Sequence, residues 1–135
     1  MPFKELEHTA DVLMRVWAPT QDGLFSESAS ALFSVIFCNA EDRGVEIPFS
    51  VEADDPDSLL HDFLSELIYF ADVEGAAFSH AGVTIHGRSL DAVVHGEPFS
   101  QERHAGGTEV KGISYSGMHI IHNDDHFAVD ILFDV

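Results

Sequence analysis

Residues 57–72 read DSLLHDFLSELIYFAD, and their apolar side chains recur at the spacing of one face of an α-helix. The members of this stripe are Leu60, Phe63, Leu64, Leu67, Ile68 and Ala71. Asp57 or Ser58 is a suitable N-cap, and Gly75 follows the expected end of the helix. Core packing explains such a stripe without a cofactor, so we predict a helix that lies on a hydrophobic core.

A second amphipathic pattern precedes this one, from Thr20 to about Phe37. Thr20 and Asp22 are suitable caps, and Cys38-Asn39 ends the pattern. We therefore predict two helices on one core. The residues expected to be most buried are Leu32, Phe33, Ile36, Phe63, Leu64 and Leu67.

The rest of the chain indicates β-strands. The expected strands are residues 12–17, 45–51, 83–86, 90–95, 110–121 and 127–133. Pro48 places its strand at a sheet edge, and Gly87-Arg88-Ser89 is expected to form a hairpin turn. We predict the α+β class, as a two-layer sandwich with both helices packed on one face of a mostly antiparallel sheet. The 135 residues suit one domain, 1–135, and the long connection 96–108 is expected to be functional or mobile.

The charge balance limits the possible partners. The chain has 24 acidic and 6 basic residues, for a formal charge of −18. A field of this sign repels phosphate backbones and excludes tight binding to RNA or DNA, whereas cations and basic protein surfaces remain possible partners. Acidic side chains spread for solubility, in a salt-rich cytosol for example, explain the same number. The single cysteine, Cys38, and the lack of a signal or membrane-spanning pattern favour the cytoplasm.

Three carboxylates are candidate metal ligands. Asp11 stands directly before an expected strand, and Asp134 and the α-carboxylate of Val135 end another. If these strands pair antiparallel, the three carboxylates converge and need a cation between them. Oxygen ligands without cysteine favour Ca²⁺, Mg²⁺ or Mn²⁺. A turn-forming Asp and a solvated acidic chain end are the simpler alternatives.

A few basic residues gather near the long connection. Glu109 and Lys111 lie two apart in an extended segment and share a face, with Arg103 just upstream. They indicate either a contact with a partner or a local salt bridge to Glu102 or Glu109. The sequence has no His-Glu-x-x-His, Cys-x-x-Cys or Gly-x-Ser-x-Gly pattern, so we expect no catalytic residues.

Taken together, these segments resemble the archease family over nearly the whole chain. The matching stretches are Glu7-His8-Thr9-Ala10-Asp11-Val12, Leu24-Phe25, Ala31-Leu32-Phe33, Leu64-Ser65-Glu66-Leu67-Ile68-Tyr69, Asp72, Gly96-Glu97, Arg103-His104, Glu109-Val110-Lys111-Gly112-Ile113-Ser114-Tyr115 and Phe133-Asp134-Val135. This sequence departs from the family pattern at Leu13, Ser100 and Ser116, where Gly, Asp and His are usual.

The resemblance implies a non-catalytic protein that activates the GTP- and metal-dependent RNA-splicing ligase. Such a protein promotes guanylylation of the ligase and multiple turnover in tRNA splicing. The family's acidic metal cluster maps to Asp11, Asp134 and Val135, its functional Glu to Glu109, and its basic residue to Arg103 or Lys111. A metal-dependent phosphate-ester hydrolase and a general chaperone of nucleic-acid enzymes are the alternatives.

Overall fold

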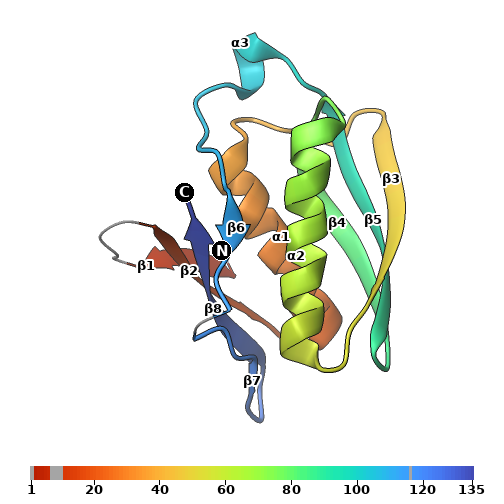
Figure 1. Ribbon diagram of the computed structural model, residues 1–135, viewed down its shortest axis with the longest axis vertical. Coiled ribbons are helices and arrows are strands. Elements are labelled where there is room, and N and C mark those ends of the chain that lie inside the picture. Colours follow the sequence, from red (N-terminus) through yellow and green to blue (C-terminus); the bar gives the residue numbers. More distant parts are fainter. Residues whose placement is uncertain (1, 7–10, 116) are drawn as a thin grey trace.

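The computed structural model of the protein describes residues 2–6, 11–115 and 117–135 (Figure 1). In chain order its elements are β1 (Phe3–Leu6), β2 (Val12–Ala18), α1 (Gln21–Ile36), β3 (Val45–Glu52), α2 (Pro56–Val73), β4 (Ala76–His86), β5 (Ser89–Pro98), α3 (Gln101–His104), β6 (Gly112–Ile113), β7 (Ile121–His122) and β8 (Phe127–Asp134). The predicted α+β class is confirmed. Within the ranges described, no helix is both long and apolar enough to cross a membrane.

The strands form two antiparallel sheets. One has the order β1-β2-β8-β6, with β7 also paired to β8, and the other has the order β3-β5-β4. The two long helices run between the sheets in Figure 1, and α1 packs against both β2 and β4. The expectation of one sheet was wrong, because alternation identifies the core-facing residues of a strand but not its pairing partner. As Pro48 predicts, β3 is an edge strand.

The two long helices begin and end close to the predicted positions. Thr20 caps α1, since its Oγ1 accepts a backbone hydrogen bond at 3.0 Å, as predicted. Asp55 caps α2 by accepting a hydrogen bond from the Ser58 N–H at 2.8 Å, so the predicted caps Asp57 and Ser58 were wrong. Pro56 explains the earlier start, because proline is tolerated in the first turn of a helix, where no intrahelical N–H bond is lost.

One hydrophobic core joins the helices to both sheets. Most residues predicted to be central are buried, namely Leu32, Phe33, Phe63, Leu64 and Leu67. Ile36 is only half-buried, because it lies at the end of α1. Phenylalanine rings link the layers: Phe25 of α1 lies 5.8 Å from Phe63 of α2, and Phe33 of α1 lies 5.5 Å from Phe78 of β4, between ring centroids.

The central hairpin β4–β5 is longer than predicted. The sequence indicated only residues 83–86 and 90–95, but β4 begins at Ala76 and β5 continues to Pro98. The missed part of β4 contains small and polar residues with no clear alternation, and its pairing with β5 shifts register between Phe78 and His80. Such a bulge disturbs the two-residue period on which the prediction relied.

The part of the chain from residue 110 onward has fewer strand residues than predicted. Of the expected strand 110–121, only the short β6 and β7 form, and the residues between them are irregular where described. The connection 96–108 contains the last residues of β5 and the short helix α3, neither of which was predicted. The strand β1 was also missed, although all of its residues pair with β2.

The long connection 96–108 packs against the end of α1. The Thr108 N–H donates to the Val35 carbonyl at 2.8 Å, and the Cys38 N–H donates to the His104 carbonyl at 3.1 Å. Gly107 permits this close approach, because a Cβ at that position would lie 1.9 Å from the Ile36 carbonyl oxygen. The connection is therefore a packed part of the domain.

We predict that Gly107→Ala destabilises the protein by about 1–3 kcal/mol, because two backbone segments must move apart to admit the methyl group. Gly82→Ala is the matched control, since a Cβ there meets no atom within 4 Å. Urea denaturation of both variants measures the difference in the free energy of unfolding. If both variants have the same free energy of unfolding, residue 107 does not pack tightly against the end of α1.

Candidate functional site

The pairing of β2 with β8 brings Asp11 and Asp134 together. The register pairs Val12 with Phe133, so Asp11 and Asp134 are the next residues along the two antiparallel strands. Opposed residues in such a pair emerge on the same face of the sheet. Both residues line one surface depression of about 420 Å³, together with Gly112, Ile113, Ser114 and Leu132. The two residues therefore lie on one depression of the surface.

The end of the chain is fixed beside this depression. Asp134 pairs with Gly112 of β6, and its carbonyl accepts a hydrogen bond from the Lys111 N–H at 2.7 Å. Val135 is half-buried and packs against the core. The terminal residue thus belongs to the folded structure. Glu7, His8, Thr9 and Ala10, which precede Asp11 in the sequence motif, lie outside the described residues, as does Ser116.

Glu109 and Lys111 lie next to the same strand. Both side chains are exposed, whereas Val110 between them is buried. The two residues therefore face solvent together, although their segment is irregular and not a strand. This arrangement makes both side chains accessible to another molecule.

Unlike Glu109 and Lys111, Arg103 contacts a buried carboxylate, that of Glu97. Its guanidinium contacts Glu97 and lies 3.3 Å from Glu41 Oε2. The anticipated salt bridge to Glu102 or Glu109 is thus replaced by contacts with two residues that are distant in the sequence.

Glu97 and His104 form the buried part of this cluster, and sequence reasoning assigned no role to either. Glu97 is 4% exposed and His104 is 1% exposed. The Ser100 N–H donates to His104 Nδ1 at 2.8 Å, so the proton of a neutral ring is on Nε2. That Nε2 lies 3.2 Å from Glu97 Oε2, within electrostatic reach but with poor hydrogen-bond geometry. The available signal was their presence in the motifs Gly96-Glu97 and Arg103-His104.

The surroundings of Glu97 favour its ionised form. Burial alone raises the pKa of this carboxyl, but the hydrogen bond from the Glu41 N–H and the contacts with His104 and Arg103 outweigh it, so the pKa is below its usual range. A charged carboxylate therefore holds together the end of β5, the loop that contains Glu41, and α3.

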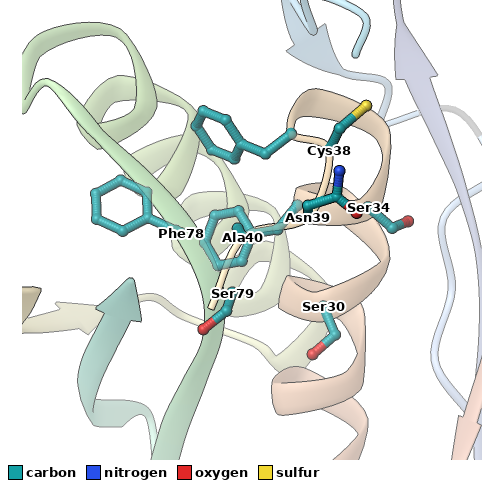
Figure 2. Close-up of a pocket in the computed structure, with 9 residues that line it drawn as sticks. Ser30, Ser34, Cys38, Asn39, Ala40, Phe78 and Ser79 are labelled. Atoms are coloured by element: carbon teal, nitrogen blue, oxygen red, sulfur yellow. The ribbon is translucent and has the colours of Figure 1, made fainter. Parts of the chain in front are cut away.

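A further depression lies at the end of α1 (Figure 2). It is lined by Ser30, Phe33, Ser34, Phe37, Cys38, Asn39, Ala40, Phe78 and Ser79. None of these side chains is an acid, a base or a histidine, so the depression offers no acid–base pair for catalysis. Its cysteine, Cys38, is half-buried.

The lowered pKa of Glu97 predicts how stability depends on pH. The carboxylate stabilises the fold above the unfolded Glu pKa of about 4.3, and this stabilisation is lost as the pH falls through the lower folded pKa. Glu97→Gln should therefore lower the free energy of unfolding near neutral pH and reduce its further loss in acid. Urea denaturation of parent and variant at a series of pH values measures both effects.

Glu102→Gln is the control, because it removes one negative charge from an exposed position on α3. The idea fails if the parent and Glu97→Gln lose the same amount of stability between neutral and acidic pH.

Comparisons with known proteins agree with this architecture. The sequence matches the Archease protein family over residues 3–135. It is 35% identical over 140 residues to a protein archease of Methanopyrus kandleri, with 100% of both chains covered. It is 38% identical over 123 residues to a protein archease of Pyrococcus furiosus, with 87% of each chain covered. A protein archease-like of Drosophila melanogaster is 31% identical over 143 residues, covering 100% of this chain and 91% of its own.

Two solved structures share the fold. Protein 1598 of Methanobacterium thermoautotrophicum has a solution structure with a TM-score of 0.78 at 23% identity, covering 99% of both chains. The crystal structure of an archease from Thermotoga maritima, described as a possible chaperone, has a TM-score of 0.70 at 18% identity, covering 98% of this chain and 96% of that one. On the family match and the identities to the curated relatives, this chain belongs to the archease family.

Proposed function

We propose that this protein is a non-catalytic activator of the GTP- and metal-dependent RNA-splicing ligase. In this role it promotes guanylylation of the ligase and multiple turnover during tRNA splicing in the cytoplasm. The observation that carries the proposal is the placement of Asp11 and Asp134 on one depression, beside a chain end that is fixed in the sheet. Family membership supplies the identity of the proposed partner.

The donor set at this depression fits a hard divalent cation. Asp11, Asp134 and the α-carboxylate of Val135 would hold Ca²⁺, Mg²⁺ or Mn²⁺, since these ions prefer oxygen ligands. Such an ion neutralises the repulsion between the carboxylates and is presented at the surface. With few protein ligands it keeps several waters, so it can exchange with another molecule.

The charge of the protein supports a basic protein surface as the partner. A net charge of −18 attracts the positively charged groove in which an RNA ligase binds its substrate. The acidic protein then acts in one of two ways: it delivers a cation to the ligase, or it occupies the groove briefly and resets the active site.

The residues near the long connection take different parts in this proposal. Glu109 and Lys111 are exposed and available to contact the ligase. Arg103 is engaged with Glu97 and Glu41, so we assign it to holding the connection in place. A general chaperone is the second candidate, because the Thermotoga maritima archease is described as a possible chaperone.

We predict that the purified protein joins no RNA and hydrolyses no phosphate ester, but raises the turnover number of the ligase at substoichiometric amounts. The reason is that an activator is released after each cycle. RNA joining by the ligase, with and without this protein, measures the effect. Intrinsic RNA joining or phosphatase activity would refute the proposal, and equal protection of unrelated enzymes would favour the chaperone.

In the same assay, Glu109→Ala and Lys111→Ala should lower activation without lowering the melting temperature, because both side chains are exposed. Glu102→Ala is the matched control on α3. Full activation by the Glu109 and Lys111 variants would remove these residues from the contact surface.

We also predict that Asp11→Ala, or a few residues appended after Val135, weakens divalent cation binding at least tenfold and lowers ligase activation to a similar degree. Each change removes or displaces one carboxylate of the set. Calorimetric titration with Ca²⁺ and Mn²⁺ measures the affinity, and circular dichroism checks the fold. Asp125→Ala, which removes an exposed carboxylate from the turn before β8, is the control. Unchanged cation affinity in the tagged and Asp11→Ala proteins would place the ion elsewhere.

A further inference from the structure

Two histidines lie side by side on the three-stranded sheet. His80 of β4 and His95 of β5 are cross-strand partners, and their rings stack with centroids 4.7 Å apart and planes 11° apart. Their neighbours Ala81 and Val94 are buried, so the two imidazoles emerge on the opposite face of the sheet, away from the core. The β-bulge between Phe78 and His80 sets this register.

Asp42 is held over the same end of the sheet by its neighbours in the chain. The Arg43 N–H donates to the Gly96 carbonyl at 2.8 Å, and the Glu41 N–H donates to Glu97 Oε2 at 2.7 Å. Both anchors lie at the end of β5. The backbone on each side of Asp42 is therefore held at the end of β5, which keeps the Asp42 side chain near His80 and His95.

The three side chains present ligand atoms to a common point. Asp42 Oδ1 lies 3.7 Å from His95 Nδ1, and Asp42 Oδ2 lies 4.0 Å from His80 Nε2. All three ligand atoms lie within 4.8 Å of one another, and this is the only such group of three in the part of the chain that the structure describes. Ligands about 2.0–2.1 Å from a tetrahedral Zn²⁺ lie roughly 3.3 Å apart, so partly exposed side chains need to move by only about an ångström.

A hydrogen bond at the bulge prepares His80 to bind a metal. Ser79 Oγ donates to the His95 carbonyl at 3.2 Å, so the same oxygen can accept a hydrogen bond from the Nδ1–H of His80 at 3.0 Å. His80 then carries its proton on Nδ1 and presents the lone pair of Nε2 toward Asp42. Metal-ligating histidines are commonly oriented in this way, by a hydrogen bond from the other ring nitrogen.

Simple ion pairing explains the cluster less well. It requires protonated imidazoles, and one carboxylate neutralises only one of two stacked rings. The same sheet face shows an ordinary pair for comparison: His86 Nε2 lies 3.5 Å from Asp91 Oδ2, without a second histidine. Other histidines also have separate contacts, since His119 lies 3.2 Å from Asp57 and His122 stacks on Phe127.

We propose that Asp42, His80 and His95 form a binding site for a transition-metal ion, with Zn²⁺ as the expected ion. Two imidazoles and one carboxylate suit Zn²⁺ and similar ions, in contrast to the oxygen ligands at Asp11 and Asp134. Glu46 is the cross-strand partner of His95 on the same face and is a candidate for the fourth ligand. If Glu46 does not coordinate the ion, the fourth position is open to water or to a side chain of a partner.

The proposed ion would also stabilise the neighbouring connection. It would fix Asp42 to β4 and β5, and Glu41, the preceding residue, contacts Arg103 at the same end of the sheet. This inference does not depend on the proposed role with the ligase.

Titration of the metal-free protein with Co²⁺, followed by visible absorption, and with Zn²⁺, followed by calorimetry, tests the site. We expect one high-affinity Co²⁺ that Zn²⁺ displaces, and a rise in melting temperature with Zn²⁺. His80→Ala and His95→Ala should each weaken Zn²⁺ binding at least tenfold and remove that rise. His86→Ala, on the same strand and face, and Asp11→Ala should leave both unchanged.

Two results would overturn the proposal. In the first, His80→Ala and His95→Ala bind Zn²⁺ as tightly as the parent while circular dichroism shows them folded. In the second, His86→Ala weakens binding as much as His80→Ala, which would indicate dispersed binding to surface histidines. In support of the proposal, we expect the ring signals of His80 and His95 in nuclear magnetic resonance spectra to shift with the first equivalent of Zn²⁺.

Discussion

The antiparallel pairing of β2 with β8 is the interaction on which the rest of the structure depends. It joins two strands from opposite ends of the sequence. The cross-strand partners Arg15 and Asp130 are 115 positions apart, so most of the chain forms the loop between them. Closing so long a loop opposes folding through chain entropy. Burial of Met14 and Val16 on one strand and of Ile131 on the other offsets that cost, because these side chains pack into the core that α1 covers. The same register places Asp11 beside Asp134.

A second constraint acts at the far end of β5. Glu97 is a buried carboxylate, and a buried charge is tolerated only when it is paired and hydrogen-bonded. Its partners come from the loop before β3 and from α3, so satisfying one charge fixes two connections at once. The same requirement places Asp42, because the backbone of its neighbour Glu41 is one of the donors. Removing one partner would leave the charge incompletely satisfied, which links the two connections energetically.

The sequence predicts the parts of this protein that depend on local pattern. Both long helices follow from apolar periodicity, and Thr20 follows from its capping chemistry. The cap of α2 was misassigned because Pro56 occupies the first position of the helix, so the cap is Asp55, two residues before the nearer predicted cap, Asp57. Features that depend on contacts between distant parts of the chain could not be predicted from local sequence pattern. The division into two sheets, the bulged part of β4 and the burial of Glu97 all arise from contacts between residues far apart in the chain. The placement of Asp11 beside Asp134 was an exception, since the expected antiparallel pairing of strands 12–17 and 127–133 was enough to predict it.

The proposed site at Asp42, His80 and His95 could not have been found by counting histidines in the sequence. Nine histidines in one chain attract attention to the closely spaced His119, His122 and His126, yet successive residues of strands and turns point in different directions. The two histidines that do meet are fifteen positions apart, and they meet only because a bulge at Ser79 resets the register of β4 against β5. Their chemistry also separates them from the carboxylates at the chain end. Imidazole nitrogens favour borderline ions such as Zn²⁺, whereas carboxylates favour Ca²⁺, Mg²⁺ or Mn²⁺. The two proposed sites therefore differ in the cation that they favour, and they lie on different sheets of the same domain.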